Sequence, residues 1–437
     1  MKKYLLIFAA AALALMAASC NPSQDQNTVK ISLQLTLDAT PLASQGVVVT
    51  LANDSGSASF EAETDESGVA TFNVPAGTYA ASAVWKEIEE GAKITYRGNN
   101  DNIVIAGATD NVIPIPVVRV VGSQIIIKEL YTTGCPKEGG SYSADAYVIL
   151  YNNSDVEADA SDIVFAIPLP SNSQATNAYS TDGVLSYEKL DWIPAQAAIW
   201  WFTSPVKIPA YSQIVVAIFG AIDHTATYPN SVNLSNGAYY WMSKNDTYKN
   251  SKYAVAETIP SSHYLQCSPF GMGNAWLISN SSPALYIGKM SQADALALST
   301  GTADFDHTAG TTAVSNAAKF PKAKILDCIE TWKANDEKNT HRFSSDLNSG
   351  HVDITNNLGY TAYRNVDKEA TEALPENAGK LVYNYAGGTF DPESQSGSTD
   401  PSGIDAEASI KAGAHIIYSD TNDSAKDFHQ RKASSLK

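Results

Sequence analysis

Three short stretches carry side chains that could hold a metal ion. Residues 304–307 read Asp-Phe-Asp-His, Asp223 precedes His224, and residues 420–427 contain several acids. Zinc and calcium sites need several ligands that converge at fixed geometry, and none of these stretches has a diagnostic spacing. The third stretch also lacks the glycine and the terminal glutamate of an EF-hand loop. We therefore expect polar loops here, and we predict neither a metal nor another cofactor.

The chain carries no sequence signature of nucleophilic or phosphoryl-transfer catalysis. It has no Gly-x-Ser-x-Gly elbow and no glycine-rich phosphate loop. Paired carboxylates for glycoside hydrolysis leave no local signature, so a hydrolase with a dispersed site stays open as a third alternative. We expect a protein that is not an enzyme.

Aromatic residues are the remaining candidates for contacts with a ligand or partner. The candidates lie in or beside predicted strands and are Trp200, Trp201, Tyr239, Tyr240 and Trp241. Neighbouring residues in a strand point to opposite faces, so one of Trp200 and Trp201 should face the core and the other should face outward, unless a second layer covers it. Exposed aromatic faces would suit sugars or a protein partner. Packing in the core or between domains is the alternative.

The composition predicts an all-β protein that does not bind nucleic acid. Only 17% of the 437 residues are charged and the net charge is −17, so no broad basic face is available to neutralise phosphates. Tyrosine is abundant, with 22 residues, and Thr, Ser, Asn, Gly and Val dilute the helix formers, which favours strands and turns.

The first residues have the pattern of an export signal. Lys2 and Lys3 precede an apolar run over residues 5–18, which is shorter than the ~20 residues that span a bilayer. Small residues then precede Cys20, an arrangement that resembles a bacterial lipobox. Ala17 stands where a lipobox usually has Leu, Val or Ile, a relaxation common in Bacteroidota lipoproteins. The resemblance implies a signal peptide over residues 1–19 and acylation of Cys20.

A lipid on Cys20 would make the membrane the first partner of this chain. Two or more acyl chains anchor a protein stably, because each buried CH₂ contributes ~0.8 kcal/mol. Residues 20–28 are polar and form a tether. We expect an outer-membrane protein, with either an outer-membrane receptor or another envelope protein as a further partner. Asp25 is the only acid in the tether, so the cell surface and the periplasmic face both stay open.

Residues 29–121 read as a small β domain. Residues 30–37 alternate apolar and polar side chains, as a half-buried strand does. Residues 64–79 combine an acidic turn, a strand and a Pro/Gly turn, and they resemble the carboxypeptidase-regulatory-like and prealbumin-type sandwich modules, which are usually spacers. Pro114 and Pro116 predict that residues 112–121 are either an extended linker or a last strand at a sheet edge.

Residues 122–386 read as a larger β domain with long loop insertions. Residues 125–131 and 147–154 form β-branched and aromatic runs closed by turn residues. These runs resemble the opening of lamin-tail-type immunoglobulin-like domains. Residues 292–298 and 323–333 are candidate helices, although residues 325–329 could equally form a strand. The loops between the strands would meet the ligand or partner.

Six segments spread over the exported chain carry a closer resemblance. They are residues 128–131, 134–137, 148–154, 221–228, 363–373 and 400–411. In these segments the chain resembles the Bacteroidales lipoproteins of the family called domain of unknown function (DUF) 4876. No catalytic or binding residues are established for that family, so the resemblance implies an anchored, all-β envelope protein and no particular site.

The C-terminal part of the chain divides into two segments. Residues 387–403 are rich in Gly, Ser, Pro and Asp and predict a flexible loop, whereas residues 404–437 are apolar enough to dock on the larger sandwich.

Three cysteines follow the anchor, namely Cys135, Cys267 and Cys328. An oxidising compartment permits one disulfide among them, and burial of unpaired thiols is the alternative.

Our first functional hypothesis is a non-enzymatic, envelope-anchored lipoprotein that presents a β-sandwich to a protein or ligand. The alternative is an accessory subunit of an outer-membrane receptor that captures a small molecule, a glycan or a metal.

Overall fold

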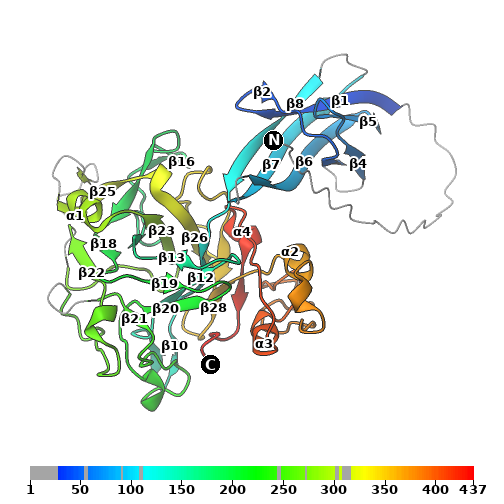
Figure 1. The fold of residues 1–437 in the computed structure, drawn as a ribbon. Helices are drawn as coiled ribbons and strands as arrows, with labels where there is room; N and C mark the ends of the chain where they lie inside the picture. Colours follow the sequence, from blue (N-terminus) through cyan, green and yellow to red (C-terminus); the bar gives the residue numbers. More distant parts are fainter. Residues whose placement is uncertain are drawn as a thin grey trace. The chain divides into compact units, whose positions relative to one another are not determined.

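The structure is a computed structural model, and it describes residues 28–53, 58–89, 92–107, 112–243, 248–270, 273–300, 305–307 and 316–437. The described chain is mostly β, with several sheets and few helices (Figure 1), so the predicted β-rich fold is confirmed. The predicted signal peptide, Cys20 and Asp304 lie outside the described residues. None of the described helices is long and apolar enough to cross a membrane.

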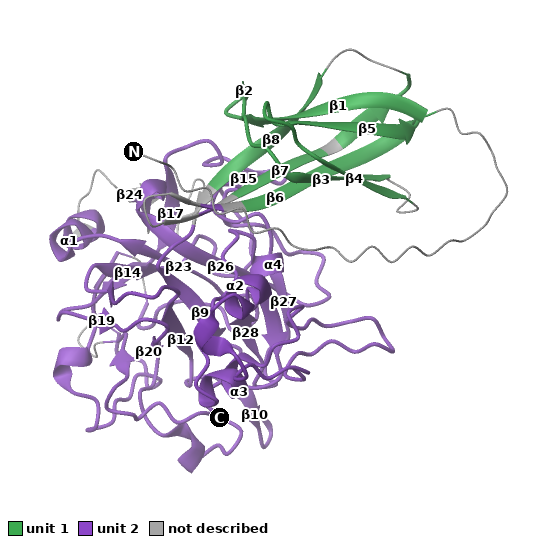
Figure 2. Cartoon of the chain, turned by 45° about the vertical axis from the view of Figure 1, so that its right-hand side comes forward, with its two compact units in different colours: residues 1–85, 96–119 green, residues 86–95, 120–437 purple. Residues whose placement is uncertain are grey.

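The chain divides into two compact units (Figure 2). Unit 1 holds residues 1–85 and 96–119, and unit 2 holds residues 86–95 and 120–437.

Unit 1 is built on one eight-stranded sheet with the order β2-β1-β8-β7-β6-β3-β4, in which β5 also pairs with β1. Its strands are β1 (Thr28–Leu37), β2 (Thr40–Pro41), β3 (Val48–Asn53), β4 (Ser59–Glu63), β5 (Val69–Pro75), β6 (Gly77–Glu89), β7 (Ala92–Ile105) and β8 (Val112–Val121). The alternation predicted in β1 is present, because Ile31, Leu33 and Leu35 are buried.

Strand β8 does not lie at a sheet edge, so the prediction drawn from its two prolines is wrong. It pairs in parallel with β1 and lies between β1 and β7. Pro114 and Pro116 occupy alternate positions, and alternate N–H groups of a strand point to the same side. The missing donors therefore fall on one side of β8, and the N–H groups of Ile113 and Ile115 on the other side are kept.

Unit 2 contains two six-stranded sheets. The first has the order β21-β20-β12-β9-β28-β29, with β9 (Ile125–Tyr131), β12 (Tyr147–Asn152), β20 (Gln213–Ala217), β21 (Tyr240–Trp241), β28 (Thr361–Arg364) and β29 (Phe428–Arg431). The second has the order β22-β18-β14-β23-β26-β27, with β14 (Ile163–Ala166), β18 (Ala198–Trp201), β22 (Gln266–Pro269), β23 (Ala284–Lys289), β26 (Ile325–Lys333) and β27 (Val352–Ile354).

One buried apolar cluster joins the two sheets. Ile127 and Val216 come from the first sheet, and Phe165, Trp200 and Ile329 come from the second. All residues of β9 and β12 are buried, so these two strands are covered on both faces. Long apolar runs, rather than strict alternation, are what such strands need.

Smaller elements surround the two sheets. The short strands are β10 (Cys135–Lys137), β11 (Gly140–Tyr142), β13 (Ala158–Asp159), β15 (Ser180–Thr181), β16 (Val184–Leu185), β17 (Trp192–Gln196), β19 (Lys207–Ile208), β24 (Phe305–His307) and β25 (Asn316–Pro321). The helices are α1 (Gln292–Thr300), α2 (Lys368–Glu372), α3 (Ala406–Lys411), α4 (Ser424–Asp427) and the 3-10 turns η1 (His224–Ala226), η2 (Ser261–His263), η4 (Lys322–Lys324) and η5 (Pro375–Asn377). Residues 292–298 are thus helical as expected, whereas residues 325–333 form a strand.

The C-terminal segment belongs to the first sheet. Strand β29 pairs with β28, and β28 pairs with β9 (Figure 1). Within residues 387–403, the Thr389 N–H lies 2.8 Å from the Ser398 carbonyl oxygen and 3.2 Å from that of Gln430. Backbone hydrogen bonds therefore hold this loop against β29.

Candidate functional site

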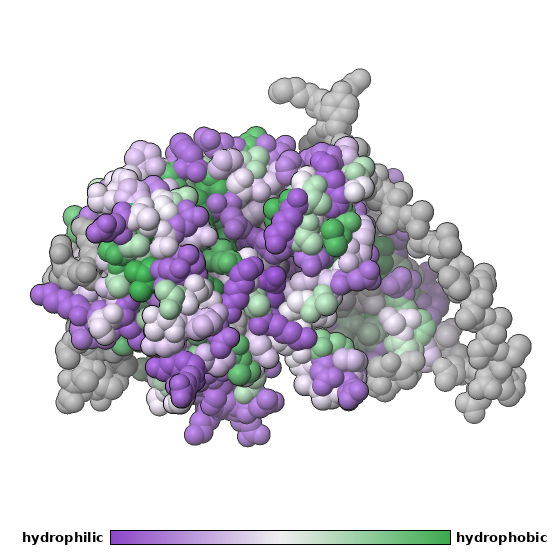
Figure 3. Space-filling model, turned by 90° about the horizontal axis from the view of Figure 1, so that it is seen from below, coloured by the Kyte–Doolittle hydropathy of each residue, from purple (hydrophilic) through white to green (hydrophobic). Residues whose placement is uncertain are grey.

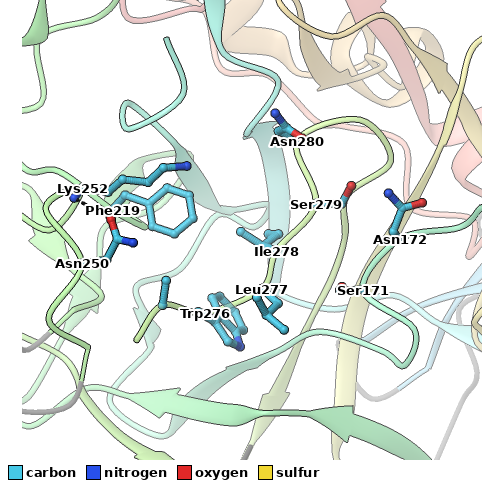
Figure 4. Close-up of a pocket in the computed structure, with 11 residues that line it drawn as sticks. Ser171, Asn172, Phe219, Asn250, Lys252, Trp276, Leu277, Ile278, Ser279 and Asn280 are labelled. Carbon is cyan, nitrogen blue, oxygen red and sulfur yellow. Dashed lines mark hydrogen bonds between the residues drawn. The ribbon is translucent and has the colours of Figure 1, made fainter. Parts of the chain in front are cut away.

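A hollow of about 330 Å³ opens on unit 2 (Figure 4). Its 11 lining residues are Ser171, Asn172, Phe219, Asn250, Lys252, Ala275, Trp276, Leu277, Ile278, Ser279 and Asn280. Figure 4 shows Lys252 and Asn250 near Phe219, with Trp276, Leu277 and Ile278 following one another along a single extended segment. This size is at the lower end of the range for small-molecule sites.

On the face drawn in Figure 3, hydrophobic residues form separate areas among hydrophilic ones, so no large continuous apolar patch marks an interaction site among the described residues of that face.

Among the described residues that line the hollow, Lys252 is the only acidic or basic one. Its Nζ lies 3.2 Å from Ser143 Oγ and 5.1 Å from the centroid of the Phe219 ring. No carboxylate of the described chain lies within ion-pair distance of this Nζ. Burial lowers the pKa of Lys252 from its usual value, and the negative charge of Asp145 opposes part of that effect.

Local hydrogen bonds fix the lysine and the extended segment together. Asn250 Oδ1 accepts a hydrogen bond from the Lys252 N–H at 3.0 Å, which is an Asx turn, and the Asn250 N–H donates to Asn274 O at 3.2 Å. The Trp276 N–H donates to the Tyr253 hydroxyl at 2.9 Å. The loop that carries Lys252 therefore cannot move independently of the segment that carries Trp276.

Aromatic rings form the floor beneath the hollow. The Trp276 ring packs edge-on against Trp200 at 5.9 Å, and Trp200 in turn packs against Tyr248 at 5.8 Å. Tyr253 lies edge-on to Phe219 at 5.4 Å. Such pairs add to the energy of simple burial, so they stabilise this floor. The Nε1 of Trp276 is buried, and it has no hydrogen-bond partner in the described chain.

The structure places the predicted aromatic contacts mostly in the interior. Trp200, Trp201 and Trp241 are each at most 2% exposed, so none of them can meet a ligand at the surface. Trp200 packs between the two sheets, whereas Trp201 belongs to a second cluster on the other face of β18. A second layer covers the outward face, which is why both indoles are buried.

Two of the predicted aromatic residues keep some exposure. Tyr239 and Tyr240 are half-buried. The Tyr240 ring stacks on His263 at 4.3 Å, and the Nδ1 of His263 lies 3.0 Å from the Tyr239 carbonyl oxygen. Neither tyrosine lines the hollow.

Two of the three candidate metal stretches are engaged by other protein groups. Both ring nitrogens of His224 have partners, Tyr142 Oη at 2.8 Å and Gly220 O at 3.0 Å. Asp420 and Asp427 lie beside the buried guanidinium of Arg364. No group of three or more His, Cys, Asp or Glu side chains within the described ranges could hold a metal ion.

None of the three cysteines in the described ranges forms a disulfide. Cys135, Cys267 and Cys328 are all buried thiols. Burial raises the pKa of the Cys135 thiol to about 11, and Asp145 adds to this effect. A thiol in this state is a poor nucleophile.

Sequence reasoning did not select Lys252, Asn250 or Trp276. Each is an ordinary polar or aromatic loop residue in the sequence. The available signal was weak: an Asn-x-Lys turn followed about twenty residues later by Trp276 in an apolar run. Only folding brings these segments together.

Comparison with known protein families finds a match to the part of the chain that forms most of the hollow. Residues 211–384 match the family model described as "Protein of unknown function (DUF4876)". This part of the chain is similar to the DUF4876 family. It includes Phe219, Lys252 and Trp276, but not the Ser171 side of the hollow.

A solved structure has a fold similar to that of this chain. The crystal structure of a DUF4876 family protein from Bacteroides thetaiotaomicron is similar to this chain, with a TM-score of 0.52 and 18% identity, over 92% of this chain and 94% of that one. A DUF3823 family protein from Parabacteroides merdae aligns with a TM-score of 0.17 and 14% identity, over 44% of this chain and 98% of that one. No curated protein matches the sequence. At these identities the DUF4876 likeness concerns the fold alone.

Proposed function

We propose that this chain is a non-enzymatic lipoprotein of the outer membrane that binds a ligand in the hollow of its larger unit. In this proposal Cys20 carries the lipid, residues 29–121 form a carboxypeptidase-regulatory-like spacer, and residues 122–386 form a lamin-tail-like sandwich with insertions. The DUF4876 family match and the fold likeness agree with it but name no ligand.

The chemistry of the lining carries the proposal. General acid–base catalysis needs titratable groups within reach of the substrate, usually as a pair. Among the 11 lining residues Lys252 is the one ionisable group, and the rest are amides, hydroxyls and apolar side chains. Such a set can orient and hold a ligand, but it supplies no acid–base pair, which favours binding over hydrolysis.

A test should ask whether the hollow retains a compound. The Cys20→Ala protein would be dialysed against a small-molecule extract of cell envelopes, and the retained compounds would be identified by mass spectrometry. At least one compound should be enriched by this protein and lost with Leu277→Trp, because a larger side chain at the rim fills the hollow.

Leu358→Trp is the matched control. Leu277 is 49% exposed and Leu358 is 47% exposed, but only Leu277 lines the hollow. Equal retention by both variants, or retention of nothing, would contradict a binding role for the hollow. Conversion of the compound into products during dialysis would identify a hydrolase.

The hollow also favours the narrower role of an accessory solute-binding lipoprotein of an outer-membrane receptor. A receptor subunit should co-purify with the full-length chain from intact envelopes, and Leu277→Trp should leave that association intact while removing the solute. Co-purification of no membrane protein would contradict the accessory role alone.

A further inference from the structure

We infer that the hollow takes a monosaccharide-sized sugar acid, with its carboxylate on Lys252 and its hydroxyl groups on the surrounding amides. This inference rests on the proposed function, because it names the class of ligand for the same site.

The first observation is an ammonium group with unused donors. An ammonium has three N–H groups, and Lys252 Nζ uses one for Ser143 Oγ at 3.2 Å. A half-buried charge without a counter-ion is costly, and a carboxylate entering the hollow would compensate it with a charge-assisted hydrogen bond.

The other charged group that faces Lys252 is engaged through one of its two carboxylate oxygens, and the other oxygen is buried without a partner in the described chain. Asp145 raises the pKa of Lys252, but it forms no ion pair with it. Asp145 Oδ2 instead accepts hydrogen bonds from the Tyr131 hydroxyl at 3.0 Å and from Ser231 Oγ at 2.5 Å. The ammonium is therefore held in place by its surroundings without being neutralised at contact distance.

The second observation is an orphaned donor in the same lining. Trp276 is 2% exposed, and its Nε1 has no partner among the described residues. Buried polar groups are almost always hydrogen-bonded, so this unpaired indole N–H is a donor without an acceptor in the described chain.

The third observation is the pattern of amides and apolar surfaces. Asn172, Asn250 and Asn280 line the hollow. The Oδ1 atoms of Asn172 and Asn250 already accept local hydrogen bonds, so these two amides would act mainly as donors to a ligand. Adjacent hydroxyl groups of a sugar present the complementary pattern. Phe219 and Ile278 provide apolar surface for the C–H faces of such a ring. The volume of about 330 Å³ suits one sugar ring rather than an oligosaccharide.

The test is a titration of the Cys20→Ala protein with D-glucuronate and, in parallel, with D-glucose, followed by calorimetry. D-Glucuronate should bind, and D-glucose should bind about 10- to 100-fold more weakly, because it lacks the charged hydrogen-bond acceptor. Failure of glucuronate to bind, or equal binding of both sugars, would overturn the inference.

Variants of the lysine make the test specific. Lys252→Met should weaken glucuronate binding by the same factor, and Lys252→Arg should keep most of it because the charge remains. Lys249→Met is the matched control, because Lys249 is exposed three positions away and does not line the hollow. Equal affinities of Lys252→Met and Lys249→Met would also overturn the inference.

The two proposals fail in distinguishable ways. If glucuronate does not bind but an envelope compound is still retained and then lost with Leu277→Trp, the ligand class is wrong and the binding function stands. If neither ligand is retained, both proposals fail.

Discussion

Oε1 of Glu407 accepts a hydrogen bond from Nζ of Lys128 at 2.7 Å, and the two residues are 279 positions apart. The Lys128 side chain on β9 is fully buried. Three tyrosine rings surround its ammonium, with centroids 5.5 to 5.9 Å away, namely Tyr151, Tyr363 and Tyr418. A single ammonium thus ties helix α3 of the C-terminal segment to the central strand of the first sheet.

Glu407→Ala should lower the free energy of unfolding by about 3 kcal/mol, because it leaves the buried Lys128 ammonium without its counter-ion. Urea denaturation would measure the change. Glu369→Ala is the matched control, since Glu369 holds the same position in α2, two residues after an aspartate cap, with its side chain exposed. The control should cost only about 0.3–1 kcal/mol, and equal losses would show that Lys128 does not depend on Glu407.

His429 should make the protein less stable in acid. Burial, with a smaller effect of Arg431, lowers the pKa of His429 to about 3. The unfolded chain takes up this proton near pH 6.5, before the folded chain does. The stabilisation is therefore complete at neutral pH, and it declines by about 1.4 kcal/mol per pH unit as the pH falls from 6.5 towards 3.

The measurement is urea unfolding of the protein and of His429→Gln between pH 7.5 and pH 4. In His429→Gln, the free energy of unfolding should fall less steeply as the pH falls, because the contribution of His429 is removed. His415→Gln, at an exposed position, should show the same pH dependence as the unmodified protein. A slope that is the same in all three proteins would refute the assignment to His429.

Tyr253→Phe should weaken both the fold and the ligand site. The substitution removes the acceptor of the buried backbone N–H of Trp276. An unpaired buried donor lowers the free energy of unfolding by about 1–3 kcal/mol. Thermal unfolding would show the loss of stability, and glucuronate titration would show weaker binding. Tyr248→Phe is the control, because the Tyr248 hydroxyl makes no hydrogen bond within the described ranges. Equal effects of both variants would show that the hydrogen bond from Trp276 to Tyr253 makes no special contribution.

Cys20→Ala should release a soluble form of the protein and abolish incorporation of labelled fatty acid. The acyl chains, rather than a helix, would be the attachment, so fractionation should move the variant out of the membrane pellet. Label that persists on the variant would contradict the anchor.

The sequence predicted the β-rich character of the fold because strand formation depends on local composition. β-branched and aromatic runs closed by turn residues correctly placed β9 and β12, and the alternation over residues 30–37 correctly placed β1. The sequence-based prediction failed for β8. Its two prolines were taken to indicate a sheet edge, but the effect of a missing N–H depends on which partner strand lies on that side, and the partners cannot be read from the sequence. The prediction also did not find the hollow, whose residues come from loops around positions 171, 219, 252 and 276.

Neighbouring residues alone were enough to predict strand-rich secondary structure. They also predict an acidic protein that does not bind nucleic acid and an export signal over residues 1–19, and these two predictions remain to be tested. Tertiary structure decided that both Trp200 and Trp201 are buried, that Lys128 meets Glu407, and that Lys252 lies beside Trp276. These residues are far apart in the sequence, so they meet only when long loops of the chain close. The free energy that favours this arrangement over others comes from packing of the whole core, and a local stretch of sequence therefore does not predict it.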